Sequence, residues 1–175
     1  GTRPTENHPV AATYFKQACK NGATLILIDP RGSGLARHAD HHLKFTGGTD
    51  VALLNAMLHV IITENLIDRD FIDKHTEGFE TLADRIKDFP PEEMSVICGI
   101  DADTIRTVAR AYATSGRSMI FWGMGVSQHS HGTDNARCLI ALALATGHIG
   151  RPGTGLHPLR GQNNVQGASD AGLIP

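Results

Sequence analysis

The sequence contains no closely spaced pair of cysteines. Its three cysteines, Cys19, Cys98 and Cys138, lie far apart along the chain. No CxxC motif or other ligand spacing is therefore present, which excludes a zinc site or an iron–sulfur cluster built from this chain alone. Three unpaired cysteines are typical of a reducing compartment, so we expect a cytoplasmic location.

Long apolar runs and blocks of basic residues are also absent. The apolar runs are far shorter than the ~20 residues that span a bilayer, and no signal peptide is recognisable. The net charge is −2 over 175 residues, with no cluster of lysine or arginine. We therefore expect neither a membrane segment nor a nucleic-acid partner.

Two further absences concern nucleotide binding and the chain ends. No GxGxxG follows any expected strand, which argues against an ordinary NAD-binding domain. The sequence opens on a loop-like segment and stops soon after a polar loop, with neither a start signal nor a polar tail. We interpret the chain as a fragment of a longer protein.

The apolar pattern predicts an α/β fold with a parallel sheet. Residues 24–28 and 118–122 are short apolar runs with β-branched or aromatic residues, typical of strands buried on both faces. A further short strand is expected over 41–45. At this length one domain is the natural expectation.

Helices are expected between and after these strands. Asn7 is a candidate N-cap for a helix with Pro9 in its first turn, and Asp101 is the candidate cap of a later helix. From apolar spacing and terminating glycines, helices are predicted over 9–20, 51–64, 68–74, 78–87, 91–97, the segment after Asp101, and a very apolar segment that includes 139–146.

Three polar loops fall where strands or helices of this pattern end. Asp29 and Arg31 follow the first strand, at the end of a parallel sheet where ligands bind. The alternative is a strand-ending turn with a surface ion pair. The turn at 47–50 and the loop at 123–128 contain glycines that let a ligand approach the backbone. Asp50 could instead cap the following helix, or serve both purposes.

The stretch 151–167 carries two arginines and a run of amides without a helical or strand period. Gln162, Asn163, Asn164 and Gln166 provide many hydrogen-bond donors and acceptors. Such a loop is costly to order unless a polar ligand lies against it. The alternative is a surface loop whose amides bond to its own backbone.

Three segments carry a family resemblance over the whole chain. Residues 158–170 (PLRGQNNVQGASD), 122–135 (WGMGVSQHSHGTDN) and 28–31 (IDPR) resemble molybdopterin-dependent formate dehydrogenases. The similarity is to the catalytic alpha subunit of the soluble NAD-dependent type. It implies a three-layer, Rossmann-like parallel sheet domain of the formate dehydrogenase/DMSO reductase type, with extra outer helices. Residues 1–150 would bind molybdopterin guanine dinucleotide, and 151–175 would form an active-site loop segment.

The same resemblance implies the cofactors and partners. Two molybdopterin guanine dinucleotides would hold one molybdenum or tungsten, with iron–sulfur clusters only outside this fragment. The full enzyme would oxidise formate to carbon dioxide and pass electrons to NAD through other subunits that carry iron–sulfur clusters and flavin. Because no candidate for the metal-ligating cysteine exists here, we assign no metal ligand and expect the fragment alone to be inactive.

Site residues follow from the matched motifs. Arg160 matches the arginine beside the metal, where its permanently charged fork suits a carboxylate. The residues implied to bind the cofactor are Asp29, Arg31, Gly48, Asp50, Gly123, Met124, Gly125, Gln128 and Gln162. Two alternatives stay open: another molybdopterin oxidoreductase, such as a nitrate reductase-like enzyme, and a non-catalytic, nucleotide-binding α/β scaffold.

Overall fold

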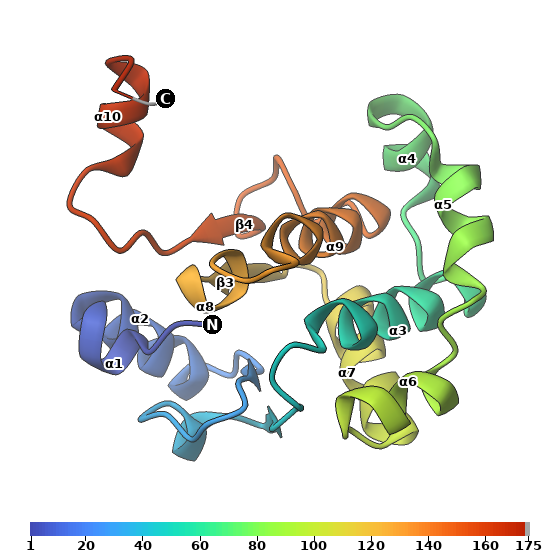
Figure 1. The fold of residues 1–175 in the computed structure, drawn as a ribbon, viewed down its shortest axis with the longest axis horizontal. Coiled ribbons are helices and arrows are strands. Elements are labelled where there is room, and N and C mark those ends of the chain that lie inside the picture. The colour runs from blue at the N-terminus through green and yellow to red at the C-terminus, as the bar shows by residue number, and fades with distance from the viewer. Residues whose placement is uncertain (174–175) are drawn as a thin grey trace.

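The computed structural model describes residues 1–173 and contains two short parallel sheets among helices (Figure 1). Strand β1 (Ile26–Ile28) pairs in parallel with β2 (His41–Leu43), and β3 (Met119–Trp122) pairs in parallel with β4 (Gly155–Pro158). The predicted α/β class with parallel strands is confirmed.

The first strand is shorter and more open than its sequence predicts. It begins at Ile26, and all three of its residues are only half-buried. Leu25 lies just outside the pairing, where its N–H donates to the Asp40 carboxylate at 2.8 Å. The prediction of burial on both faces was wrong because β1 has a single strand neighbour, β2, in a two-stranded sheet.

Most of the chain is helical. The helices are α1 (Pro4–Asn7), α2 (Pro9–Lys20), η1 (Ala36–His38), α3 (Asp50–Thr63), α4 (Arg69–His75), α5 (Phe79–Ile86), α6 (Pro91–Cys98), α7 (Ala102–Thr114), α8 (Met124–Ser127), α9 (Gly132–Ala145) and α10 (Val165–Asp170). None of the helices within residues 1–173 combines the length and the apolar character needed to cross a membrane.

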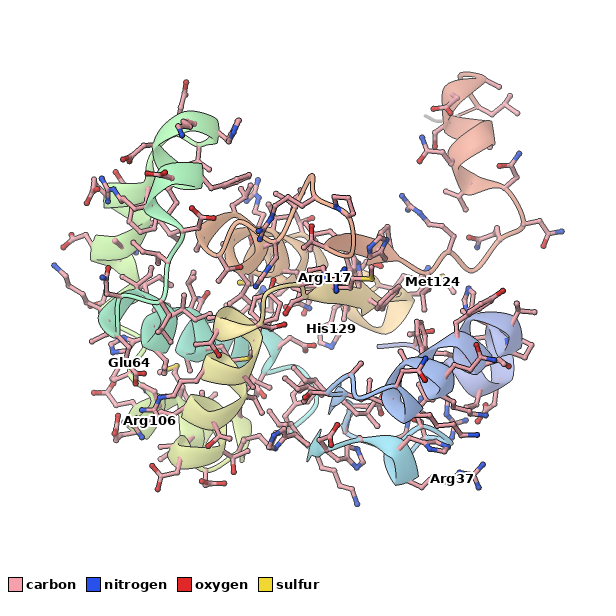
Figure 2. The ribbon with its side chains drawn as sticks, turned by 180° about the vertical axis from the view of Figure 1, so that it is seen from behind. Arg37, Glu64, Arg106, Arg117, Met124 and His129 are labelled. Atoms are coloured by element: carbon pink, nitrogen blue, oxygen red, sulfur yellow. The ribbon has the colours of Figure 1, made fainter. Side chains whose placement is uncertain are left out.

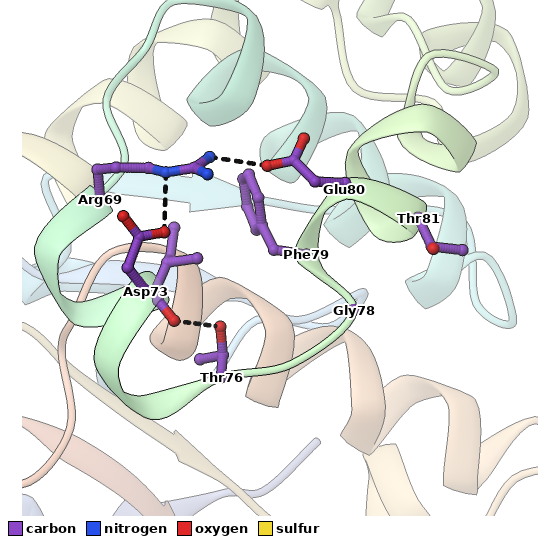
Figure 3. Close-up of a pocket in the computed structure, with 8 residues that line it drawn as sticks. Arg69, Asp73, Thr76, Gly78, Phe79, Glu80 and Thr81 are labelled. Atoms are coloured by element: carbon purple, nitrogen blue, oxygen red, sulfur yellow. Dashed lines mark hydrogen bonds and ion pairs between the residues drawn. The ribbon is translucent and has the colours of Figure 1, made fainter.

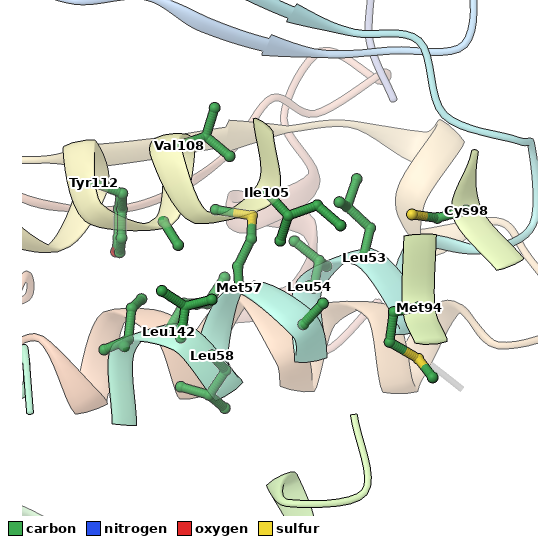
Figure 4. Packing of buried hydrophobic residues seen from close by; sticks show 14 of the residues in the cluster. Leu53, Leu54, Met57, Leu58, Met94, Cys98, Ile105, Val108, Tyr112 and Leu142 are labelled. Carbon is green, nitrogen blue, oxygen red and sulfur yellow. The ribbon is translucent and has the colours of Figure 1, made fainter. Parts of the chain in front are cut away.

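The core forms where α3 packs against α6, α7 and α9 (Figure 4). Leu53, Leu58 and Ile61 of α3 are almost completely buried, as is Ile105 of α7. Burial of each such side chain contributes about 1.5–3 kcal/mol. These contacts fix the helices that support the loops described below.

Helix caps agree with the sequence in one case and differ in two. Asp101 caps α7 by accepting from the Thr104 N–H at 2.9 Å, as predicted. Asn7 does not cap α2, because it ends α1 and His8 occupies the N-cap position. Asp50 lies inside the first turn of α3, whose N-cap is Thr49, so its predicted capping role was wrong.

His148 is a buried histidine that joins two core helices. Its side chain is 2% exposed, and Nε2 lies 3.1 Å from the Tyr112 carbonyl oxygen at the end of α7. The two rings meet edge to face at 5.2 Å. Desolvation lowers the pKa of His148 and outweighs the hydrogen bond to Tyr112, which raises it; the charge of Arg151 also lowers the pKa. The folded chain therefore favours the neutral ring.

This burial predicts a loss of stability in mild acid. The unfolded ring titrates near pH 6.5, and the folded ring titrates lower, so the unfolded state takes up the proton first. Stability is unaffected well above pH 6.5 and falls as the pH drops through that value toward the folded pKa. Urea unfolding between pH 7.5 and 5.5 should show a steeper loss for wild type than for His148→Gln; parallel profiles would contradict the assignment.

The C-terminal segment is more regular than expected. The stretch 151–167 was predicted to lack helical and strand structure, but it contains β4 and the start of α10. Figure 1 shows α10 projecting away from the rest of the molecule. Because β4 pairs with β3, the expected boundary at residue 150 falls inside a paired unit, and the division at that point stays a prediction. Residues 174 and 175 of the expected segment lie outside the described residues.

Candidate functional site

Asp29 occupies the carboxyl end of β1 and is 6% exposed. Its Oδ1 accepts the N–H of Arg31 at 2.8 Å, and its Oδ2 lies 3.8 Å from the backbone nitrogen of Gly1. The Arg31 side chain is exposed, and within residues 1–173 it forms no ion pair with Asp29. The alternative interpretation, a surface ion pair between Asp29 and Arg31, is therefore wrong.

The N-terminal residues lie between two of the predicted loops. The Gly125 N–H donates to the Gly1 carbonyl oxygen at 2.8 Å. A Cβ at Gly123 would lie 2.7 Å from the Thr2 Cβ, and one at Gly125 would lie 2.7 Å from the Gly1 Cα. These glycines admit the chain's own N-terminal residues. The close approach of a ligand to the same loop stays a prediction.

The turn at 47–50 faces the same region. Gly48 has φ +89, a left-handed conformation that suits glycine, and a Cβ there would lie 3.5 Å from the His129 ring. The turn at 47–50 therefore lies beside the segment that follows the loop at 123–128.

The loop after β3 forms a short helix, α8, held by a buried amide. Asn135 of α9 is 1% exposed and donates from Nδ2 to the Val126 carbonyl oxygen at 2.9 Å. Gln128 follows the last residue of α8. Its N–H donates to the Met124 carbonyl at 2.7 Å, and its side chain is exposed. Sequence reasoning missed Asn135, although it lies in the motif that follows the strand.

The segment that carries the run of amides, residues 159–167, starts beside α8. The Leu159 N–H donates to the Trp122 carbonyl at 2.7 Å, which continues the β3–β4 ladder by one residue. A Cβ on Gly161 would lie 2.7 Å from the Met124 methyl group. Figure 2 shows Met124 next to this segment. The backbone around Arg160 therefore lies against the loop that begins at Gly123.

Two predicted side chains point away from this packing. The side chains of Arg160 and Gln162 are exposed, and no hydrogen bond from either occurs within the part of the chain that the structure describes. Further along, the Asn164 side chain accepts the Gly167 N–H at 3.0 Å and caps α10. The expected self-bonding of the amides thus holds for Asn164.

The described pockets lie elsewhere. One, of about 280 Å³, lies between α4 and the start of α5 and is lined by exposed ion pairs of Arg69 with Asp73 and Glu80 (Figure 3). A larger hollow of about 510 Å³ is lined by Asp68, His148 and Arg151 among others, and by no residue of the turns at 29–31, 47–50 or 123–128. Exposed ion pairs contribute little to stability, and neither hollow gathers the predicted site residues.

The polar turns fit a nucleotide-like ligand. Asp29, Arg31 and Asp50 supply carboxylates and a cation, which match the N–H groups of a guanine ring and a phosphate. Added Cβ atoms at Gly32 and Gly47 would meet nothing within 4 Å, so space is open beside both carboxylate turns. Within residues 1–173, no cluster of three or more histidine, cysteine, aspartate or glutamate residues could hold a metal ion.

The family follows from a comparison with known proteins. The family model described as molybdopterin oxidoreductase matches residues 1–174. The chain belongs to the molybdopterin oxidoreductase family. Relatives that it matches include proteins named as formate dehydrogenases, which agrees with the resemblance carried by residues 158–170.

Two curated relatives match over the full 175 residues. The alpha subunit of the F420-dependent formate dehydrogenase of Methanocaldococcus jannaschii is 49% identical, and formate dehydrogenase H of Escherichia coli is 46% identical. The match covers all of this chain but only 26% and 24% of those proteins. The chain therefore spans about a quarter of the length of these relatives.

A solved structure supports the fold. Acetylene hydratase from Pelobacter acetylenicus superposes with a TM-score of 0.76 at 33% identity, over 79% of this chain and 19% of that one. The parallel-strand α/β arrangement is thus shared with that protein. Since that enzyme is named for acetylene, the fold by itself does not determine the substrate.

Proposed function

We propose that this chain is the cofactor-binding and substrate-lining segment of a formate dehydrogenase catalytic subunit. The observation that carries the proposal is the position of the Arg160 backbone. It lies beside the Gly123–Gly125 loop. Asp29 reaches the same loop through Gly1, and the turn at Gly48 lies beside His129, which follows that loop. The guanidinium of Arg160 is exposed next to the turns that we propose to bind the cofactor.

The residues divide into two groups in this proposal. Asp29 and Asp50 accept hydrogen bonds from a guanine edge, and Arg31 binds a phosphate. The remaining proposed cofactor contacts are Gly48, Gly123, Met124, Gly125, Gln128 and Gln162. When bound, the bis-molybdopterin guanine dinucleotide, carrying molybdenum or tungsten, supplies the two-electron chemistry.

Arg160 is the proposed substrate-binding residue. Its planar guanidinium presents parallel N–H donors that match the two oxygens of formate. Its charge also favours entry of the anion. Because the side chain makes no hydrogen bond within residues 1–173, its donors are available to a ligand.

The reaction and its acceptor extend beyond this chain. Formate is converted to carbon dioxide, a proton and two electrons, which pass through iron–sulfur clusters in other parts of a cytoplasmic enzyme. The proposed acceptor is NAD, reached through subunits with iron–sulfur and flavin groups. Because a relative is named for F420, formate-dependent reduction of NAD and of F420 should be measured with the full-length complex. Reduction of F420 without reduction of NAD would refute NAD as the acceptor.

The decisive test is a substrate assay of the full-length protein. We expect formate-dependent dye reduction and no comparable reaction with nitrate and a reduced dye. Nitrate reduction alone would favour the nitrate reductase-like alternative. If neither substrate reacts in a protein that holds its metal, the proposal fails.

The 175-residue chain itself should bind guanine nucleotides but catalyse nothing. We expect GDP to raise its melting temperature more than ADP or NAD at equal concentration, because Asp29 and Asp50 accept from guanine N–H groups. We also expect no formate-dependent dye reduction, since the metal ligand lies outside the chain. Equal shifts with all nucleotides, or formate-dependent turnover, would contradict these two expectations.

A further inference from the structure

A histidine near the N-terminus contacts the backbone of Arg160. The Nε2 of His8 lies 2.9 Å from the Arg160 carbonyl oxygen, a contact across 152 positions of the chain. Because a carbonyl oxygen only accepts, the ring donates through Nε2–H. Nothing in the sequence pattern around His8 predicted this contact, since it joins the junction of α1 and α2 to the residue proposed to bind substrate.

The His8 ring is also held from its other side. Its Nδ1 lies 2.9 Å from the side-chain oxygen of Asn7, which in turn lies 3.4 Å from the Thr2 hydroxyl. A neutral ring with its proton on Nε2 leaves Nδ1 as an acceptor, which the Asn7 amide satisfies through its NH2 after a half-turn. The contacts at Nδ1 and Nε2 together orient the ring toward Arg160.

The segment that carries His8 is itself fixed against the site. Phe15 of α2 packs against Phe121 of β3 with ring centroids 4.7 Å apart, and Phe121 stacks on His157 of β4 at 4.9 Å. Thr2 lies against Gly123. The ring of His8 is therefore held by elements that also frame the loop after β3.

Few other contacts hold Arg160. On its N-terminal side, the Leu159 N–H donates to the Trp122 carbonyl oxygen. On its C-terminal side, the next regular element is α10, which begins at Val165. No long-range hydrogen bond fixes the backbone of 161–164 within the described residues. The His8 contact is thus the last long-range hydrogen bond before the chain leaves the body of the molecule.

We propose that His8 is a positioning residue for Arg160. By holding the Arg160 carbonyl, it fixes the peptide plane and hence the direction in which the guanidinium leaves the backbone. The inference rests on the proposed role of Arg160 in binding formate. The anchoring contact can nevertheless be tested independently of the substrate.

The test uses the full-length enzyme with three variants. His8→Leu removes the donor, and His8→Gln keeps an N–H that can reach the carbonyl. His59→Leu is a matched control, because His59 Nδ1 contacts the Ile86 carbonyl at 3.0 Å between α3 and the end of α5, away from the site. The readouts are formate kinetics per bound metal and hydrogen exchange of the Leu159 amide.

The expected result separates positioning from folding. His8→Leu should raise exchange at Leu159 and lower formate kcat/KM, each on the order of tenfold, because a small displacement of a substrate-orienting group is costly. His8→Gln should keep both within about twofold of wild type. His59→Leu should lower the melting temperature but leave both readouts within about twofold.

Each other outcome has a defined meaning. Unchanged exchange at Leu159 in His8→Leu would overturn the anchoring contact, whatever the substrate proves to be. Raised exchange with unchanged formate kinetics would overturn the positioning role. If the wild-type enzyme does not oxidise formate, the proposed function fails. Hydrogen exchange at Leu159 would then still show whether His8 holds the backbone of Arg160. Should His8→Leu not fold, His8→Ser replaces it with the same criteria.

Discussion

Arg160→Ala in the full-length enzyme should lower formate turnover by about 10²–10³-fold while leaving the molybdenum or tungsten content within about twofold of wild type. Loss of a charged donor aimed at the reacting group commonly has an effect of that size. The metal content should persist because the Arg160 side chain is exposed and makes no hydrogen bond within residues 1–173. Turnover per metal and metal analysis of the same sample provide the measurement.

Two comparisons sharpen this expectation. Arg160→Lys keeps the charge but loses the planar fork, so its turnover should fall between those of wild type and Arg160→Ala. Arg85→Ala removes an exposed arginine of α5 and should change neither readout. If metal content and turnover fall together in Arg160→Ala, the residue serves cofactor loading or folding, and its proposed role in binding formate is wrong.

The helices could be predicted largely because their signals are local. Asp101 precedes the apolar spacing of α7 and caps it, and the apolar face of α3 recurs within one helix. Tertiary contacts did not have to be known in either case. The apolar spacing that predicts both helices corresponds to their buried faces in the structure.

The strands and the C-terminal segment depended on distant partners. The sequence of β4, Gly155–Pro158, has no alternating pattern, and it becomes a strand because β3 lies beside it. Burial of β1 was overestimated because the sequence does not tell how many neighbours a strand has. Strand pairing over long separations is therefore the part of this fold that local pattern could not supply.

The candidate site shows the same division. The position of Asp29 after β1 followed from the rule that ligands bind at the carboxyl ends of parallel strands. The contacts made by His8 and Asn135 could not be predicted, since each joins residues that are adjacent only after folding. Similarity to a family supplied a role for Arg160, whereas only the structure shows what holds its backbone.

Gly132→Ala should destabilise the chain by about 3 kcal/mol and impair cofactor loading of the full-length enzyme. Gly132 is buried at the start of α9, and a Cβ there would lie 1.9 Å from the carbonyl oxygen of Ser127, the last residue of α8. The obstacle is backbone and cannot rotate away, so α8 and α9 must separate, at a cost typical of overpacking. Urea unfolding and bound guanine nucleotide provide the two measurements.

The damage should extend from that turn to the proposed cofactor loop. Val126 of α8 is held by Asn135 of α9, and the N–H of Gly125 contacts the N-terminal segment. Separating α8 from α9 breaks the first contact and shifts the second. Gly132 has no positive φ, so turn chemistry alone would not single it out, and its requirement for glycine comes from close backbone packing.

A matched glycine distinguishes this mechanism from a general intolerance of alanine. Gly116 also lacks a positive φ, but a Cβ there would meet nothing within 4 Å. Gly116→Ala should therefore change the free energy of unfolding by less than about 0.5 kcal/mol and leave cofactor content unchanged. Equal effects of the two substitutions, or normal cofactor content in Gly132→Ala, would show that the packing of α8 on α9 does not determine the shape of the cofactor loop.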